Sequence, residues 1–111
     1  MDSKEWKIVF LNRKAEDEFH QLPSEMKAHY WHIVSLIKEF GPHNVGMPHI
    51  KLIVKKIWEI RVRGKDGIAR VLYTTIVNRK LVILRVFIKK TQKTPDAEIR
   101  IALKRLKEVE E

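Results

Sequence analysis

The chain has no cysteine among its 111 residues, and glycine and proline occur only four times each. Without cysteine there is no disulfide framework, no thiolate metal site and no cysteine nucleophile. The sequence also lacks an apolar run long enough to cross a bilayer, and its N-terminus has no basic start followed by an apolar stretch. These absences predict a soluble, cytoplasmic protein without a membrane partner.

Several recognisable chemical motifs are missing as well. The sequence contains no glycine-rich phosphate loop, no Ser/His/Asp arrangement and no cluster of metal-ligand residues. His29 and His32 lie three residues apart in a predicted helix, but no carboxylate or further histidine is placed to complete a metal site. We therefore expect no metal and no cofactor, and we interpret these two histidines as part of a solvated helix face.

What the chain does contain is enough apolar material for a core and an uneven charge distribution. Its hydrophobic content of 44% and its length predict a single domain over residues 1–111. Residues 51–93 hold thirteen Lys/Arg and two Asp/Glu, whereas residues 1–50 hold six and seven, and residues 94–111 hold four and five. All of the excess positive charge therefore lies in the middle of the chain, which indicates a surface that binds a polyanion.

The apolar pattern predicts an α+β fold with the element order β-α-α-β-β-β-α. Alternating or continuous short apolar runs are typical of strands, and apolar residues three or four apart are typical of helices. Strands are predicted over residues 5–10, 57–63, 68–77 and 81–90, and helices over 13–22, 25–40 and 95–109. Residues 64–67 and 78–80 resemble hairpin turns, so we expect an antiparallel sheet.

Polar residues mark the expected helix starts. Asn12, Ser24 and Thr94 each precede a predicted helix, and their side-chain oxygens can accept hydrogen bonds from its free N–H groups. Pro95 directly follows Thr94 and suits the first helical position.

Cations from three segments are predicted to converge on one side of the sheet. Arg61 and Arg63 share the polar face of one strand, and Arg70 lies in the partner strand of the hairpin. Lys89, Lys90 and Lys93 follow at the far end of the last strand. Because the arginine fork binds two oxygens and keeps its charge, this arrangement indicates phosphate binding.

Two motifs in this region resemble a known family. They are "LIVKKIWEIRVRGKDGIARVLY" and "FIKKTQKTPDAEIRIALKRLKE", and the string from Phe87 to Pro95 is the most specific part. Over residues 49–107 the chain resembles the phage-derived, HigB-like branch of the RelE/ParE toxin superfamily. The resemblance implies a twisted antiparallel sheet, with the N-terminal helix pair on one face and a concave, basic opposite face.

The resemblance also implies a function and partners. It implies a toxin of a type II toxin–antitoxin system that enters the 70S ribosome and cuts messenger RNA without a cofactor. Its expected inhibitor is a helix-turn-helix, HigA-like antitoxin. Arg70 matches the arginine that contacts the scissile phosphate, while Lys90 and Arg61 fall near two further cations of the family's active site. The family's tyrosine early in the last helix, and the histidine that some HigB toxins carry near the C-terminus, are absent here.

Three groups of residues are therefore predicted to form the site. Arg61, Arg70 and Lys90 are the expected catalytic cations. The expected RNA contacts are Lys51, Arg63, Lys89, Thr91, Gln92 and Lys93. A base that takes the 2′-hydroxyl proton adds about 10²–10⁴-fold to the rate. A lysine crowded by other cations could serve as this base, and His49 and Glu59 are the other two candidates for the acid–base role.

Two alternative functions agree with the same sequence. A ParE-like toxin that inhibits gyrase shares the fold and cuts nothing, so the fold alone does not separate the two activities. A non-catalytic RNA- or DNA-binding module is the second alternative, since the family's tyrosine and histidine are missing. The dense cation set on the sheet favours the nuclease.

Overall fold

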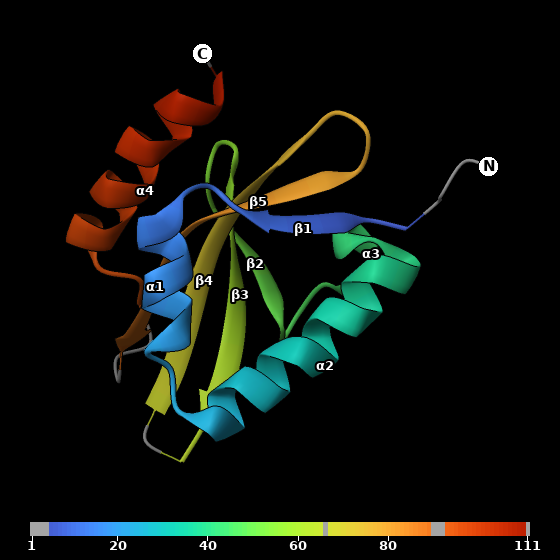
Figure 1. Cartoon of the computed structure of the whole chain (residues 1–111), viewed down its shortest axis with the longest axis vertical. Coiled ribbons are helices and arrows are strands. Elements are labelled where there is room, and N and C mark those ends of the chain that lie inside the picture. Colours follow the sequence, from blue (N-terminus) through green and yellow to red (C-terminus); the bar gives the residue numbers. More distant parts are fainter. Residues whose placement is uncertain (1–4, 66, 90–92, 111) are drawn as a thin grey trace.

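The computed structural model describes residues 5–65, 67–89 and 93–110. Five strands form one sheet in the order β1-β5-β4-β3-β2 (Figure 1). The strands are β1 Lys7–Phe10, β2 Ile50–Val54, β3 Ile57–Gly64, β4 Gly67–Ile76 and β5 Lys80–Lys89, and the helices are α1 Arg13–His20, α2 Ser24–Phe40, α3 Pro42–Val45 and α4 Asp96–Glu110. The predicted α+β fold is confirmed.

One strand runs in a direction that the sequence did not predict. β2, β3, β4 and β5 pair antiparallel as expected, but β1 pairs parallel with β5. The hairpin turns fix the direction of β4 and β5 relative to their predecessors. No turn joins β1 to β5, because three helices and three strands separate them along the chain, so local turn signals left the direction of β1 open.

Two short elements and one cap also differ from the expectation. Neither β2 nor α3 was predicted from the sequence; β2 is a five-residue edge strand with an irregular register, and its sequence does not alternate regularly. Asn12 caps α1 as predicted, and its side chain accepts a hydrogen bond from the Ala15 N–H at 3.0 Å. Ser24 is not a cap, because it is already the first residue of α2 and Pro23 occupies the capping position.

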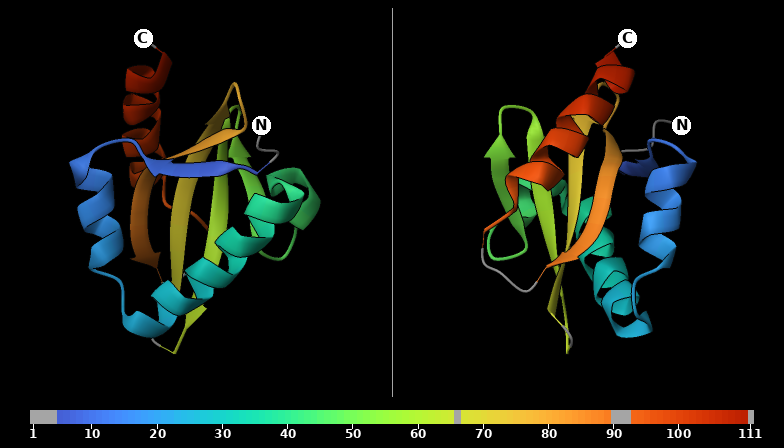
Figure 2. Two further views of the ribbon diagram at one scale, coloured as in Figure 1. Left: turned by 45° about the vertical axis from the view of Figure 1, so that its right-hand side comes forward. Right: turned by 90° about the vertical axis from the view of Figure 1, so that its left-hand side faces the viewer.

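The sheet separates two apolar cores. The larger core lies between the sheet and helices α1 and α2, and includes Phe19, Met26, Tyr30, Ile33, Ile60, Val62 and Val71. The smaller core lies on the opposite face, where α4 packs, and includes Ile57, Leu72, Val82, Leu84, Ala102 and Leu106. Figure 2 shows α1 and α2 on one side of the sheet, with α4 crossing the strands separately. The face opposite α1 and α2 is thus shared between α4 and a region that it leaves uncovered.

No helix in residues 5–65, 67–89 and 93–110 has both the length and the apolar character needed to span a membrane.

Candidate active site

Strand alternation places a group of charged side chains on the α4 face of the sheet. Trp58, Ile60 and Val62 of β3 belong to the larger core, so Glu59 and Arg61 between them point to the opposite face. Arg61 pairs with Arg70 across the β3–β4 ladder, and Lys51 of β2 pairs with Glu59. Residues that pair in register lie on the same face, which brings all four side chains together.

Glu59 and Arg70 form a buried ion pair at the base of this group. The relative exposure of Glu59 is 0% and that of Arg70 is 1%. Arg70 Nη1 donates to Glu59 Oε1 at 2.9 Å, and Arg61 Nε lies 3.7 Å from the same oxygen. One carboxylate balances only one of the two arginines, so the three charges sum to +1.

Thr94 joins this group from the segment that leads into α4. Its hydroxyl donates to Glu59 Oε2, and it also accepts a hydrogen bond from Arg70 Nη1 at 3.4 Å. The sequence predicted Thr94 as a helix cap. In the structure, the Thr94 hydroxyl donates to Glu59 of the sheet instead. The first turn of α4 is formed by the N–H groups of Glu98 and Ile99, which donate to the Pro95 carbonyl. Thr94 therefore ties the start of α4 to β3.

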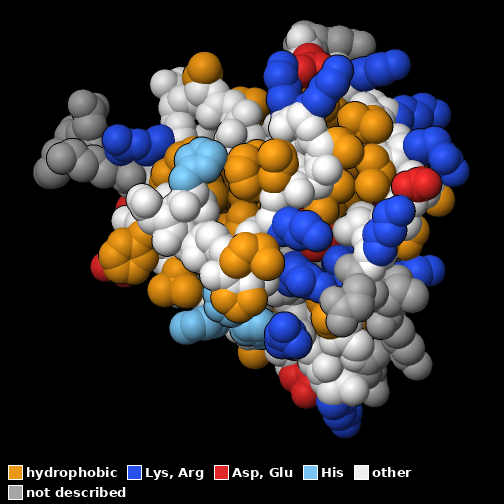
Figure 3. Space-filling model, turned by 180° about the vertical axis from the view of Figure 1, so that it is seen from behind, with side chains coloured by type: hydrophobic (Ala, Val, Ile, Leu, Met, Phe, Trp, Pro, Cys, Tyr) orange, Lys and Arg blue, Asp and Glu red, His pale blue; other side chains and the backbone are white. Residues whose placement is uncertain are grey.

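A pocket of about 360 Å³ opens above the buried pair. Among the residues that the structure describes, its lining consists of Lys51, Leu52, Ile53, Arg61, Lys93, Thr94 and Ile99. Three of these residues are cations and none is an acid. Figure 3 shows Lys and Arg side chains gathered near the middle of this face, next to apolar ones. An open, cationic pocket with an apolar wall suits a phosphate and the sugar or base attached to it.

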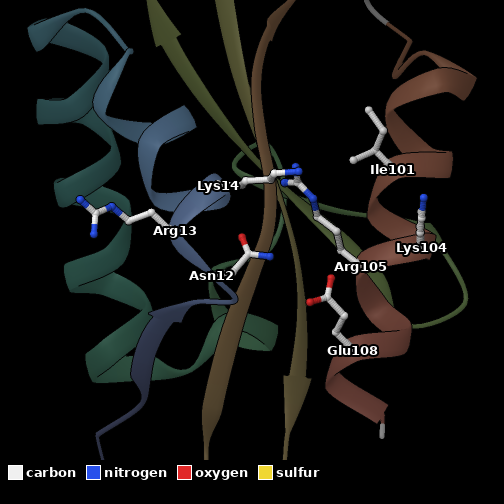
Figure 4. Close-up of a pocket in the computed structure, with 7 residues that line it drawn as sticks. All are labelled: Asn12, Arg13, Lys14, Ile101, Lys104, Arg105 and Glu108. Atoms are coloured by element: carbon white, nitrogen blue, oxygen red, sulfur yellow. The ribbon is translucent and has the colours of Figure 1, made fainter.

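A larger pocket of about 500 Å³ lies between the start of α1 and α4, but both of its arginines are already paired with carboxylates. Arg105 in its wall donates to Glu18 and to the Leu84 carbonyl. Arg13 lies 3.8 Å from Asp17 and points away from the other lining residues in Figure 4, while Glu108 adds a negative charge. The pocket at Arg61 is therefore the stronger candidate for an anion site.

The chain matches a protein family over most of its length. The model of the family described as "Phage derived protein Gp49-like" matches residues 17–107. The chain belongs to this Gp49-like family. The match confirms the phage-derived family that the motifs at residues 49–107 predicted.

Two solved structures share the fold of this Gp49-like protein. One is the E. coli toxin RelE, a double arginine-to-alanine mutant in the free state, with 16% identity, a TM-score of 0.58 and coverage of 92% of this chain and 98% of the toxin. The other is the archaeal RelE–RelB complex from Pyrococcus horikoshii, with 13% identity, a TM-score of 0.56 and coverage of 80% and 99%. They confirm the predicted RelE-like fold. No curated protein sequence gives a match.

The structure places the predicted catalytic cations of the Gp49-like chain at different depths. Arg61 lines the pocket, and its side chain is 15% exposed. Arg70 lies beneath the pocket and is held by Glu59 and Thr94. A direct contact between Arg70 and phosphate would require this buried pair to open. Lys90 lies outside the described residues.

Only some of the predicted RNA contacts line the pocket. Lys51 and Lys93 line the pocket together with Arg61. Arg63 and Lys89 are exposed on the same face but do not line it, and both pair with Ile68 of β4. Thr91 and Gln92 lie outside the described residues.

The two acid–base candidates lie at different depths. Glu59 is fully buried below the pocket. His49 precedes β2, and its ring lies 5.6 Å from the ring of His29 on α2 rather than in the pocket wall. The His49 carbonyl accepts the Arg61 N–H at 2.8 Å, so the backbone of His49 supports the strand that carries Arg61. Among residues 5–65, 67–89 and 93–110, no three His, Cys, Asp or Glu side chains lie close enough together to hold a metal ion.

Sequence reasoning missed the structural role of His29. This residue was predicted to lie on a solvated helix face, but its Nδ1 accepts the backbone N–H of Arg63 at 2.8 Å. The imidazole thus bonds to β3 just beyond the last β2–β3 pair, Ile50 and Ile60. No spacing rule signals such a contact, because it joins residues 34 positions apart.

His29 should make the stability of the fold depend on pH. Burial lowers the pKa of the His29 imidazole below 6.5, and the neighbouring His49, His32 and Arg63 lower it further. The folded pKa is then below the unfolded one, so the contribution of His29 is complete above about pH 6.5 and is lost as the pH falls below it. We expect the free energy of unfolding in urea to decrease between pH 7.5 and pH 5.5, and less so for His29→Gln. An equal decrease in both proteins would contradict this role.

The apolar lining of the pocket was also missed. Leu52, Ile53 and Ile99 carry no chemistry that a motif would reveal. The one available signal was the apolar run "IKLIV", which forms the edge strand β2 and brings Lys51 opposite Glu59.

Proposed function

We propose that this protein is the toxin of a type II toxin–antitoxin pair and cleaves messenger RNA on the ribosome. The observation that carries the proposal is the pocket lined by Arg61, Lys51 and Lys93 on the open face of the sheet. The phage-derived family and the fold shared with the toxin RelE support the same conclusion. Residues 1–111 would form one toxin domain that acts in the cytoplasm, where ribosomes are found.

The proposed reaction is attack of a ribose 2′-hydroxyl on the neighbouring phosphate. The O2′–P bond forms, the P–O5′ bond breaks, and the 2′ proton passes to a base while the leaving oxygen gains a proton. Negative charge grows on the phosphate in the transition state, and cations held at that position stabilise it. Arg61, Lys51 and Lys93 would provide this charge, joined by Lys90 as the family motif implies. The proposed chemistry requires no metal and no cofactor.

Arg61 suits the central role in this reaction. Its guanidinium never loses its charge and donates to two phosphate oxygens at once. Its backbone is fixed in β3 by the bond to the His49 carbonyl and by pairing with Arg70. A donor on a rigid strand needs little reorganisation as the reaction proceeds, which is the condition for strong electrostatic catalysis.

The exposed cations around the pocket would bind the RNA on either side of the cleaved phosphate. Arg63 and Lys89 lie further along the same face. In the sequence, Thr91 and Gln92 lie between Lys89 and Lys93. Such contacts neutralise phosphates and position the strand without reading its sequence.

The ribosome should be required for fast cleavage. The pocket is open, and neither His49 nor Glu59 lines it, so neither is placed to take the proton of a freely moving 2′-hydroxyl. Orientation of the messenger RNA by the ribosome would supply the in-line geometry. We expect the purified protein to cut messenger RNA in translating ribosomes, detected as new toeprint stops, and to cut the same naked RNA far more slowly.

The control for this experiment is the same messenger RNA on ribosomes without the protein. Equal cleavage rates with and without ribosomes would overturn ribosome dependence. Inhibition of gyrase without any cleavage would instead support the ParE-like alternative and overturn the proposed function.

An antitoxin should bind this protein tightly. We propose a helix-turn-helix, HigA-like partner that covers the basic face or prevents entry into the ribosome. One free toxin acts on many messengers, so inhibition requires a dissociation constant below about one micromolar, or about −8 kcal/mol. Isothermal titration with the product of the neighbouring gene measures it. Weaker binding by a partner that protects cells would contradict the toxin assignment.

A further inference from the structure

We propose that Arg70 is a positioning residue that occupies Glu59 and so keeps the charge of Arg61 available to a bound phosphate. This inference rests on the proposed function and deepens it. It assigns Arg70 a role behind the pocket, in place of the direct phosphate contact that the family motif implied. The basis is the unequal way in which one carboxylate holds two arginines.

Glu59 is hydrogen-bonded to Arg70 but not to Arg61 Nε. Arg70 Nη1 lies 2.9 Å from Glu59 Oε1, with good hydrogen-bond geometry. Arg61 Nε lies 3.7 Å from the same oxygen, is buried, and has no hydrogen-bond partner among the described residues. The closer and better aligned cation receives most of the carboxylate's attraction, because charge-assisted hydrogen bonds are the stronger ones. Arg61 therefore retains most of its positive charge toward the pocket.

The other contact of Glu59 keeps the carboxylate in this orientation. Its Oε2 accepts the hydroxyl proton of Thr94, so the carboxylate is held from two sides. With both oxygens engaged and no exposed surface, Glu59 is placed to orient its neighbours rather than to take a proton from a substrate. Of the two acid–base candidates, the structure thus makes Glu59 a second positioning residue.

Removal of Arg70 should have an indirect effect on the pocket. Glu59 would then have Arg61 as its nearest cation, and their charges would cancel beneath the phosphate site. A second substitution that removes the carboxylate should release Arg61 again. The direct-contact model predicts the opposite, because a group that touches the phosphate is not replaced by deleting its partner.

The experiment compares Arg70→Met with the double variant Glu59→Gln/Arg70→Met. The probe is a fluorescent 2′-O-methyl oligoribonucleotide, which presents phosphates but has no 2′-hydroxyl nucleophile. By anisotropy, we expect Arg70→Met to bind about tenfold more weakly and the double variant to recover to within about threefold of wild type. Arg61→Met should stay weak with or without the other two changes. Arg100→Met removes an exposed α4 charge outside the pocket lining and should bind like wild type.

A folded double variant that binds as weakly as Arg70→Met would overturn the proposal. If Arg70→Met does not fold, Arg70→Lys decides: a lysine still occupies Glu59 and should preserve binding, whereas loss of binding in this variant would support a two-pronged phosphate contact by Arg70. The double variant should fold in either case, since replacing a buried pair by neutral groups is often close to neutral for stability.

A second readout separates this proposal from the proposed function. The ¹⁵Nε–Hε signal of Arg61 reports its pairing with Glu59 without any ligand. We expect it to shift in Arg70→Met and to return in the double variant; an unchanged signal in Arg70→Met would overturn the proposal even if the probe does not bind. Cleavage on programmed ribosomes is measured in parallel. Absence of cleavage by wild type, with this pattern of signals intact, would refute the nuclease and leave the role of Arg70 standing.

Discussion

Replacement of Arg61 by alanine should lower single-turnover cleavage of messenger RNA on programmed ribosomes by about 10²–10³. Arg61 is the arginine in the pocket wall, and Glu59 and Arg70 behind it nearly balance each other. Without Arg61 the group of three charges falls from +1 to zero, and the developing charge on the phosphate loses its central donor. The fold should survive, because the hydrogen-bonded pair of Glu59 and Arg70 remains intact.

Two further variants make this prediction specific. Arg61→Lys should recover only part of the rate, since an ammonium cannot replace a two-pronged contact. Arg79→Gln removes a charge from the β4–β5 turn, at the opposite end of β5 from Lys89, and should affect only salt-sensitive binding. Circular dichroism serves as the folding control. Wild-type cleavage by folded Arg61→Ala would place the active site elsewhere.

The side of the sheet on which the site lies could be predicted from the sequence, but its depth could not. The alternation in "WEIRVR" placed Glu59 and Arg61 on one face and Trp58 and Ile60 on the other, as the structure shows. Alternation distinguishes two faces but not an exposed position from one below another side chain. Beneath the pocket Arg70 is hydrogen-bonded to Thr94, which is 24 residues away in sequence and lies just before α4.

Two of the three hairpins in the sheet were predictable from the sequence. The hairpins β3–β4 and β4–β5 followed from their turn residues and apolar runs. The parallel pairing of β1 with β5 depends on contacts between distant segments, for which local propensity carries little information. The β2–β3 hairpin is local, but its turn is Lys55-Lys56, which contains none of the usual turn residues, and so β2 was missed.

The cations of residues 51–93 do not all belong to the basic pocket. The sequence predicted a single basic surface, and Arg61, Lys51 and Lys93 do meet in one pocket. Arg85 of the same segment is instead half-buried between Glu18 of α1 and Glu98 of α4. Composition shows where cations lie in the chain but not which of them meet carboxylates from other segments.

Replacement of Glu18 by glutamine should destabilise the fold by about 3 kcal/mol, as expected for a broken buried ion pair. Glu18 accepts hydrogen bonds from Arg85, from Arg105 and from the Val86 N–H at 3.1 Å. It thereby joins α1 to β5 and α4, and its side chain is only 16% exposed. The substitution leaves two largely buried arginines without their shared carboxylate, and urea denaturation measures the loss.

Acid should produce the same loss in the unmodified protein. Burial alone would raise the pKa of the Glu18 carboxyl, but hydrogen bonds from Arg105 and Val86 and the charges of both arginines outweigh it and lower the pKa. The folded pKa is then below the unfolded one, so this stability is complete above about pH 4.5 and is lost as the pH falls through the folded pKa. Glu18→Gln should lack this part of the acid dependence.

The matched control for Glu18 is its neighbour Asp17. Asp17 pairs with Arg13 at 3.8 Å, but the two side chains are 60% and 87% exposed. Exposed pairs contribute about 0–1 kcal/mol, so Asp17→Asn should change the free energy of unfolding little at any pH. If Glu18→Gln is no less stable than Asp17→Asn, the Glu18 carboxylate does not hold α4 against the sheet. The attachment of α4, and with it the position of Thr94 at the pocket, would then rest on its other contacts, among them the Arg85–Glu98 ion pair and the apolar packing of Ala102 and Leu106.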